Sequence, residues 1–226
     1  MSRYRHVIVV LALLSLAADA SFDDRTVAGL IAHGQALAES SNHPAALEKY
    51  DAALSRDANS ADAHAWKAAS LIALKRLDEA DSEIQKALKA NSSEFTYQMI
   101  AGRLQIARDN IEEGTATYGR AAKSSPKNAG KIYADLAAAL AAKNDEKLNP
   151  QIESALKSAA SADPPHVDAL FNLGQSYVSA GKPEGKDYLK RYLDAESKLP
   201  EDQRDKQKMQ LARKMIRAVD ILNQVR

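Results

Sequence analysis

The stretch that decides the fold is residues 61–94, ADAHAWKAASLIALKRLDEADSEIQKALKANSSE, because the segments on either side repeat its spacing of small and large residues. Written as three lines, residues 27–60, 61–94 and 95–128 agree at four positions, each 34 residues after the last. Three of these positions hold small residues and one holds large residues: Gly34, Ala68 and Gly102; Ala46, Ala80 and Gly114; Ala53, Ala87 and Ala121; and the large Tyr50, Ile84 and Tyr118. The period predicts helix pairs, since small residues let two helices cross closely while large ones fill the gaps.

The composition agrees with helices rather than sheets. Of 226 residues, 45% are hydrophobic and 27% are charged, whereas aromatic residues make up 5% and there are only 9 Gly and 7 Pro. Ala and Leu, both strong helix formers, supply much of the apolar content. One helix pair cannot bury its own apolar face, so several consecutive pairs must stack before the array is stable.

Beyond residue 128 the period loosens, but two further pairs are predicted at about 130–166 and 167–200. The turn of the fourth pair, residues 143–149, carries about three extra residues before Pro150, which is tolerated at the start of a helix. The fifth pair follows a break at residues 163–165, and its turn carries about two extra residues. Residues 201–226 are predicted to cap the array with a helix whose apolar positions are Met209, Ala212, Met215, Ile216, Val219 and Leu222.

The repeat at residues 61–94 resembles the tetratricopeptide repeat, with Asp78-Glu79-Ala80 opening its second helix and residues 85–88 closing it. Residues 170–177, LFNLGQSY, are similar to the family's first helix, and Pro126 matches the Pro that follows the second. The resemblance covers residues 21–200. It implies an all-α fold, a right-handed superhelical solenoid of about five antiparallel helix pairs plus the C-terminal capping helix.

Residues 1–20 are typical of a secretory signal peptide. Arg3 and Arg5 precede an apolar run at residues 7–18, and small residues at Ala18 and Ala20 suit cleavage after Ala20. We therefore expect an exported protein, periplasmic or secreted; an uncleaved membrane anchor is the alternative. Cleavage would remove two of the 31 basic and one of the 30 acidic residues, which leaves no net charge. We accordingly expect neither nucleic acid as a partner nor membrane insertion after cleavage.

No catalytic, metal or cofactor site is predicted. The chain has no Cys, and no two of its histidines stand four residues apart as one helical face would require for a metal. His33 and His64 fall at inward positions, which favours packed or hydrogen-bonded core histidines over a catalytic or metal pair across the stack. The segment GKPEGK at residues 181–186 follows a helix and lacks Ser or Thr after its lysine, so it is interpreted as a turn.

The resemblance also implies a binding face, because in this family the first helices line a concave groove. Carried onto this sequence, the groove residues expected to contact a partner are Ile72, Met99, Arg103, Ile106, Phe171, Gln175 and Val178. One subgroup of the family grips a chaperone's terminal carboxylate with Lys, Asn and Arg at such positions. Here only Arg103 fits that pattern, so this activity is rejected.

The sequence therefore predicts a non-catalytic protein–protein interaction scaffold or adaptor of the bacterial cell envelope, with a protein or peptide partner in the groove. The alternative is a helical enzyme or small-ligand receptor with a pocket between repeats, for which the sequence offers no convergent set of polar residues. It also remains open whether the Ala-rich groove positions are ordinary core, and whether the C-terminal helix fills the groove.

Overall fold

The structure is a computed structural model that describes residues 22–224, and these residues form eleven α-helices, three short 3₁₀ turns and no strand. The predicted all-α helical-repeat class is thereby confirmed. The signal peptide predicted at residues 1–20 lies outside the described residues, as does the side chain of Leu222. The handedness of the predicted superhelix stays a prediction, because the chain divides into two compact units, up to Asn110 and from Ile111 onward.

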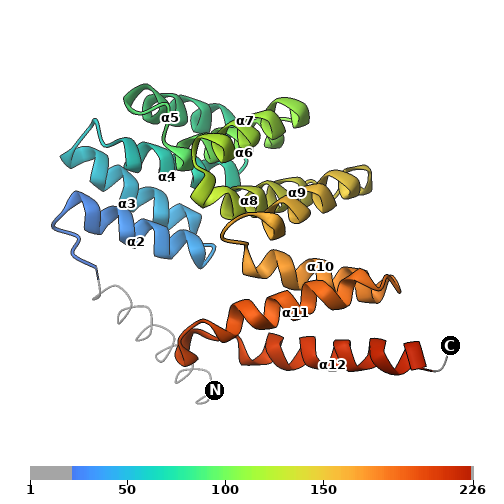
Figure 1. The fold of residues 1–226 in the computed structure, drawn as a ribbon. Helices are drawn as coiled ribbons and strands as arrows, with labels where there is room; N and C mark the ends of the chain where they lie inside the picture. Colours follow the sequence, from blue (N-terminus) through green and yellow to red (C-terminus); the bar gives the residue numbers. More distant parts are fainter. Residues whose placement is uncertain (1–21, 225–226) are drawn as a thin grey trace, which may run out of the picture. The chain divides into compact units, whose positions relative to one another are not determined.

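The first unit consists of two helix pairs and a fifth helix (Figure 1). Its helices are α2 (Val27–Glu39), α3 (His43–Arg56), α4 (Ala61–Ala73), α5 (Leu77–Ala90) and α6 (Phe95–Ala107). Helix α2 packs against α3 and α4 packs against α5, and α4 also contacts the first helices on both sides, α2 and α6. The three first helices therefore form one layer of this unit.

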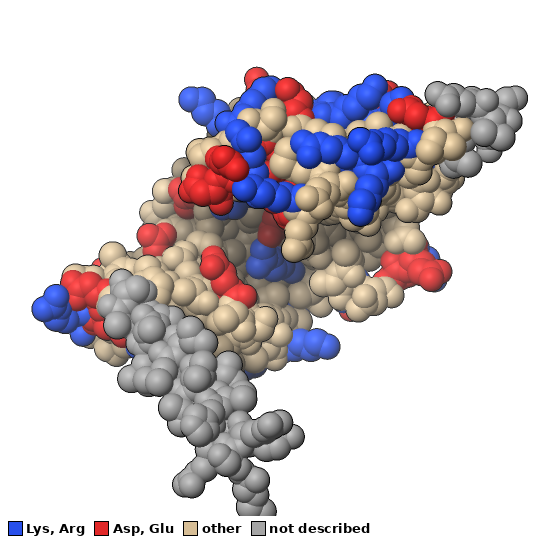
Figure 2. Space-filling model, turned by 90° about the horizontal axis from the view of Figure 1, so that it is seen from below, with Lys and Arg blue, Asp and Glu red and all other residues tan. Residues whose placement is uncertain are grey.

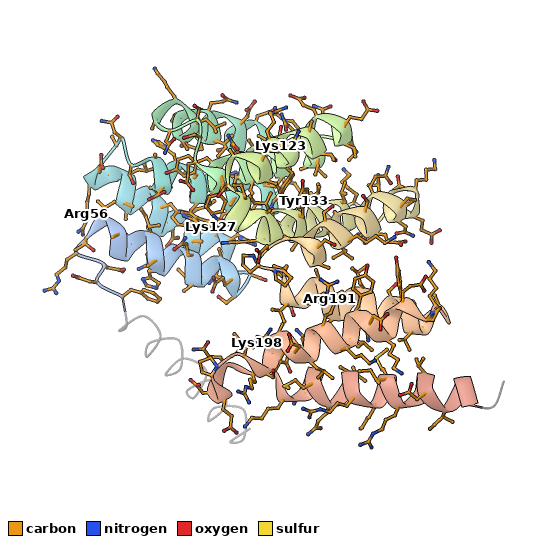
Figure 3. All side chains as sticks on the ribbon, in the orientation of Figure 1. Arg56, Lys123, Lys127, Tyr133, Arg191 and Lys198 are labelled. Carbon is orange, nitrogen blue, oxygen red and sulfur yellow. The ribbon has the colours of Figure 1, made fainter. Side chains whose placement is uncertain are left out.

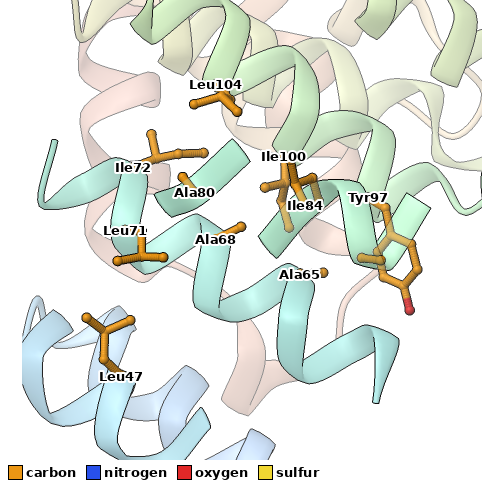
Figure 4. Close-up of a cluster of buried hydrophobic side chains, with 11 residues drawn as sticks. Leu47, Ala65, Ala68, Leu71, Ile72, Ala80, Ile84, Tyr97, Ile100 and Leu104 are labelled. Atoms are coloured by element: carbon orange, nitrogen blue, oxygen red, sulfur yellow. The ribbon is translucent and has the colours of Figure 1, made fainter. Parts of the chain in front are cut away.

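The core of the first unit lies between α3, α4, α5 and α6 (Figure 4). Leu71, Ile84 and Ile100 fill it, and Ala68 and Ala87 are fully buried where the helices cross. Burial of such side chains supplies about 25 cal/mol for each Å² of apolar surface removed from water. The repeated small and large positions of the sequence are thus core positions.

Gly34 shows why one of these positions must be small. A Cβ atom added to Gly34 would lie 2.4 Å from Cε1 of Tyr50, a distance that real Cβ contacts do not reach. Tyr50 itself is fully buried. The bare backbone of α2 therefore lets the Tyr50 ring of α3 lie directly across it.

The turns inside the helix pairs also repeat. Ser41, Lys75 and Asp109 each have a positive φ, between 59° and 67°, and they stand 34 residues apart. Residues other than glycine rarely adopt this conformation. It ends the first helix of each pair and turns the chain toward the second helix. Asn144 and Gly181 repeat the conformation in the two pairs whose turns were predicted to be longer.

The second unit contains six helices (Figure 1): α7 (Ile111–Ser124), α8 (Ala129–Ala141), α9 (Asn149–Ser161), α10 (Val167–Ser179), α11 (Glu184–Ser197) and α12 (Lys206–Gln224). The repeat predicted at residues 95–128 is divided between the units, with α6 in the first and α7 in the second. Arg191 of α11, labelled in Figure 3, donates a hydrogen bond to the carbonyl oxygen of Ala160 and so joins α11 to α9.

The last helix, α12, packs against α10 and α11. It buries Met209 and Ala212 in one cluster with Leu189 and Tyr192. Its other face carries the exposed Arg213 and Arg217, and Figure 2, which views the molecule from below Figure 1, shows Lys and Arg side chains gathered along it. The same helix also exposes two large apolar side chains, Leu211 at 41% and Ile221 at 61%, so its outer face is less polar than expected.

Candidate functional site

The structure places the seven predicted groove residues in different environments. Four are buried in the cores of the two units: Ile72, Met99, Ile106 and Phe171. Arg103 and Val178 are half-buried, and Gln175 is exposed. A buried side chain packs against its own chain in this conformation, so direct partner contact is left to the last three. That contact stays a prediction.

Phe171 is covered by the C-terminal helix. Met209 of α12 lies in the same buried cluster, and Lys208 Nζ bonds Asp168 Oδ1 at 2.8 Å one helical turn before Phe171. The first-helix face of α10 is therefore occupied by α12 at this end. Whether this face of α10 belongs to a binding groove stays a prediction.

The first-helix layer of the first unit carries two adjoining pockets. The polar pocket, of about 230 Å³, is lined by Gln35, Ala38, Glu39, His43, Tyr50, Trp66, Ala69, Ser70, Ala73 and Arg103. The adjoining pocket, of about 460 Å³, is lined by Val27, Ala28, Ile31, Gln35, Ser60, Asp62, Trp66 and Thr96. Gln35 and Trp66 belong to both, so the two pockets form one continuous hollow over α2, α4 and α6.

Small side chains on the first helices produce this hollow. Ala38 of α2 and Ala69 and Ala73 of α4 line the polar pocket where longer side chains would fill it. Trp66 stands one helical turn before Ser70, is half-buried, and lines both pockets. These three Ala positions therefore also leave open the space of the polar pocket.

Three residues that line the polar pocket each have a buried polar atom with no hydrogen-bond partner among the described residues: His43 Nδ1, the Tyr50 hydroxyl and the Ser70 hydroxyl. Tyr50 is 0% exposed and Ser70 is 1% exposed. A buried polar group without a partner costs about 1–3 kcal/mol. Three such residues line one pocket, which no sequence motif predicts.

The surroundings of Tyr50 describe the electrostatics of this pocket. Burial raises the pKa of Tyr50, and the Ser70 hydroxyl lowers it by a smaller amount although the two groups form no hydrogen bond of acceptable geometry. The Glu39 carboxylate adds to the increase in the Tyr50 pKa, which places a negative charge near the hydroxyl. Arg103 supplies a positive charge to the same lining. The lining thus carries one charge of each sign.

One signal in the sequence points toward this pocket. Ser70 is the only hydroxyl-bearing residue in residues 61–73, and it follows three inward Ala positions in an otherwise apolar helix face. A polar side chain at an inward position is informative because burying it without a partner is costly. Tyr50 gave no such signal, since its ring fills a core position in register with Ile84.

The two buried histidines are hydrogen-bonded core residues, as predicted. His33 Nδ1 lies 2.9 Å from Asp24 Oδ1, and its ring stacks on Phe22 with centroids 5.0 Å apart. His64 bonds Glu83 through Nδ1 and the Ala58 carbonyl oxygen through Nε2. Both rings therefore join segments of the first unit.

The carboxylates beside these histidines are held ionised. Burial opposes ionisation of Glu83 and is the largest single influence, but the hydrogen bond to His64 and the charges of Lys67 and Lys86 outweigh it and lower the Glu83 pKa. Asp24 follows the same pattern, because bonds from Lys49 and His33 outweigh the effect of burial on its pKa. Through these contacts Glu83 of α5 is joined to α4, and Asp24 is joined to α3.

Within residues 22–224 no group of three or more His, Cys, Asp or Glu is arranged to hold a metal ion. In the same part of the chain, no helix combines the length and the apolar character that a membrane span requires.

Comparisons with known proteins agree on the fold. Residues 31–94 match a tetratricopeptide repeat family model, and no curated protein matches the sequence. Three of the solved structures that are similar to this chain serve as examples. The first is a thermophilic tetratricopeptide-repeat protein of Thermus thermophilus, with TM-score 0.58, 15% identity, and 84% of this chain and 99% of that chain covered.

The second is a tetratricopeptide repeat protein of Parabacteroides merdae, with TM-score 0.59, 15% identity, and 96% of this chain and 80% of that chain covered. The third is PilW, a type IV pilus biogenesis factor, with TM-score 0.53, 20% identity, and 78% of this chain and 80% of that chain covered. Likenesses at these identities concern the fold alone. Together with the family match over residues 31–94, they support a tetratricopeptide-repeat protein.

Proposed function

We propose that this chain is a non-catalytic scaffold or adaptor of the bacterial cell envelope that holds a segment of a partner protein against its first-helix layer. Tetratricopeptide-repeat proteins generally mediate protein–protein interaction, and their scaffold is typically non-catalytic. The observation that carries the proposal is the continuous hollow over α2, α4 and α6, in which Gln35 and Trp66 line both pockets. A surface shared by three successive helices suits an extended or helical segment better than a compact molecule.

The envelope location rests on residues 1–20, whose charged start, apolar run and small residues before the cut are those of an export signal. PilW gives an example of a similar fold in type IV pilus biogenesis. We propose export to the periplasm or beyond, with a protein of the envelope as the partner.

Site-specific photocrosslinking tests this proposal. A photoreactive phenylalanine analogue replaces Gln35, which belongs to both pockets, in the full chain expressed in its native cells. The matched control carries the same analogue at Gln85, which is exposed on the second helix α5 of the same unit. We expect a discrete adduct with one polypeptide from position 35 and none from position 85. Equal adducts from both positions, or none from position 35, would contradict the proposed binding face.

A second candidate function, a receptor for a small polar molecule, is favoured by one observation. His43, Tyr50 and Ser70 line the polar pocket, and each has a buried polar atom without a hydrogen-bond partner among the described residues. A few polar groups in a concave site are typical of ligand pockets. The same photocrosslinking experiment separates the two candidates, because a receptor for a small molecule yields no polypeptide adduct at Gln35.

A further inference from the structure

We infer that the adjoining pocket of the first unit binds a cationic side chain, Arg or Lys, carried by the segment that the first-helix layer holds. The inference rests on the proposed function for the source of that side chain, but its chemistry depends only on the pocket.

The first step concerns access. The adjoining pocket, of about 460 Å³, is lined by side chains that a guest can reach. Asp62 is exposed and Trp66 is half-buried, as are the apolar side chains that α2 contributes, Val27 and Ile31. Asp62 and Trp66 stand four residues apart on α4 and therefore lie on one face of that helix. A guest side chain thus meets a carboxylate and an aromatic ring together.

The second step concerns charge. Asp62 is the single charged residue in this lining. It accepts a hydrogen bond from a neutral group, the Tyr97 hydroxyl, at 2.6 Å, and no Lys or Arg of the described residues forms an ion pair with it. Arg25, which precedes α2, is itself paired with Asp23 at 2.8 Å. The charge of Asp62 is therefore available to a guest, and it attracts a cation but repels a carboxylate.

The third step concerns the charges around Tyr97. Burial is the largest influence on the pKa of Tyr97 and raises it, and the hydrogen bond to Asp62 raises it further. The charges of Asp62 and Glu94 act in the same direction, so both charges that act on this hydroxyl are negative. Glu94 caps α6 by accepting a hydrogen bond from the backbone N–H of Thr96, which lines the pocket. A second carboxylate therefore lies beside the lining.

The fourth step concerns position and shape. Tyr97 is buried in the core, and Figure 4 shows its hydroxyl turned toward α4, where it holds one oxygen of the Asp62 carboxylate. The other carboxylate oxygen keeps its capacity to accept hydrogen bonds from a guest. Val27 and Ile31 supply apolar contact for the aliphatic stem of an Arg or Lys, and the face of Trp66 attracts a cation. The pocket thus suits a long side chain with a charged end.

Trp66 provides a direct measurement, because it is the single tryptophan of the chain and lines the pocket. The probe is a pentapeptide with arginine at its centre, two alanines on each side and both ends blocked. It is titrated into the full chain and followed by Trp66 fluorescence and by the NMR signal of the indole N–H. The matched ligand carries citrulline, which has nearly the same shape as arginine but no charge.

We expect saturable binding of the arginine peptide in the roughly millimolar range usual for so small a ligand. The citrulline peptide should bind at least about threefold more weakly, because it cannot form the ion pair with Asp62. Salt at about 0.5 M should reduce this difference, since it screens exposed charges.

Asp62→Asn removes the charge but keeps an oxygen that can accept the hydrogen bond of Tyr97. The affinity for the arginine peptide should fall at least about threefold, to that of the citrulline peptide. Asp78→Asn is the matched control, because Asp78 also lies in the first turn of a helix, α5, but outside the pocket. Both variants lose a carboxylate that favours a helix N-terminus, so either can change the melting temperature. Only Asp62→Asn should lose the preference for arginine over citrulline.

Equal binding of the two peptides by the parent chain, or an arginine preference that survives in Asp62→Asn, would overturn the inference. Absence of saturable binding by the arginine peptide would overturn it as well. Free arginine as a third ligand separates the two sources of a cationic group, and tighter binding of the free amino acid than of the peptide would overturn the assignment to a partner's side chain. A polypeptide adduct at Gln35 without an arginine preference defeats this inference alone. An arginine preference without an adduct defeats the proposed function alone.

Discussion

At the scale of single residues, the close approach of α2 and α3 depends on the missing side chain of Gly34. Its place in the repeat predicts a small residue, but only the structure shows that Tyr50 is the neighbour that requires it. The same contact fixes the Tyr50 hydroxyl at the polar pocket. One position therefore serves both packing and the candidate site.

Gly34→Ala is expected to destabilise the protein. Overpacking a core costs about 1–3 kcal/mol, and replacing a helical Gly by Ala offsets about 1 kcal/mol of it, so we expect a net loss of up to about 2 kcal/mol in the free energy of unfolding. Gly119→Ala is the matched control, because nothing lies within 4 Å of a Cβ atom at that helical position. The control should be neutral or slightly stabilising in urea denaturation. A loss of equal size in both variants would contradict the role assigned to Tyr50.

The Glu83 carboxylate, held by a hydrogen bond to His64 and by the charges of Lys67 and Lys86, is expected to make stability depend on pH. The pKa of Glu83 is lowered in the folded state relative to the ordinary value of about 4.3, so its charge stabilises the fold above that pH, and the contribution is lost as the pH falls through the folded-state pKa. Glu83→Gln should therefore flatten the decline in the free energy of unfolding between about pH 5 and pH 3. Denaturant titrations at several pH values measure this.

The control for Glu83→Gln is the variant Glu79→Gln, measured at high salt. The pKa of Glu79 is also lowered, chiefly by its hydrogen bond to Arg76, but that pair is solvent-exposed. At about 1 M salt, where the Debye length is only about 3 Å, Glu79→Gln should match the parent chain, whereas Glu83→Gln should remain flatter. Identical plots of unfolding free energy against pH for the two variants would show that burial of Glu83 does not add to its effect on stability.

At the scale of helices, the sequence predicted the elements well and their exposed faces less well. The helical spacing of Met209 and Ala212 correctly predicts a helix with these residues inward. The same spacing could not show that Leu211 and Ile221 stay exposed. Apolar periodicity shows which face of a helix is apolar, but the positions of the helices that cover that face are not given by the sequence. The turn of the fourth pair is longer than those of the first three, as its extra residues predicted.

Met209→Ala tests the packing of α12. The Met209 side chain lies in the buried cluster of the second unit, and truncating such a side chain to Ala typically costs about 2–5 kcal/mol. We expect a loss of about that size, together with faster hydrogen exchange in α10, α11 and α12. Leu211→Ala, on the exposed face of the same helix, should change the free energy of unfolding by no more than about 0.5 kcal/mol. Comparable losses in the two variants would contradict the packing of α12 with Met209 inward and Leu211 outward.

At the scale of the whole molecule, two compact units share one kind of building block, a pair of antiparallel helices. Their division between α6 and α7 could not be predicted from the period, because residues 95–128 continue the repeat without a break. A constant period indicates that neighbouring helix pairs can stack. The division into units depends on how many contacts each segment makes, and therefore on distances between helices that the period does not give.

The export proposal belongs to this scale. Intact mass measurement of the protein isolated from an envelope fraction should show a chain that begins at Ser21, because the small residues Ala18 and Ala20 precede the expected cut. As a control, Ala18→Arg should block processing and leave the longer form. A mature protein that retains residues 1–20 would favour the membrane-anchor alternative.

The sequence by itself determined the all-α class, the helix pairs and the small and large core positions, since a period of 34 residues repeats local packing requirements. The tertiary structure decided which first-helix residues reach the surface. Ile72, Met99 and Ile106 occupy groove positions by register yet are buried, because register gives a direction around one helix and not the distance to the next. The polar pocket likewise needs His43 and Tyr50 from α3 beside Ser70 from α4, and only packing brings these two helices together.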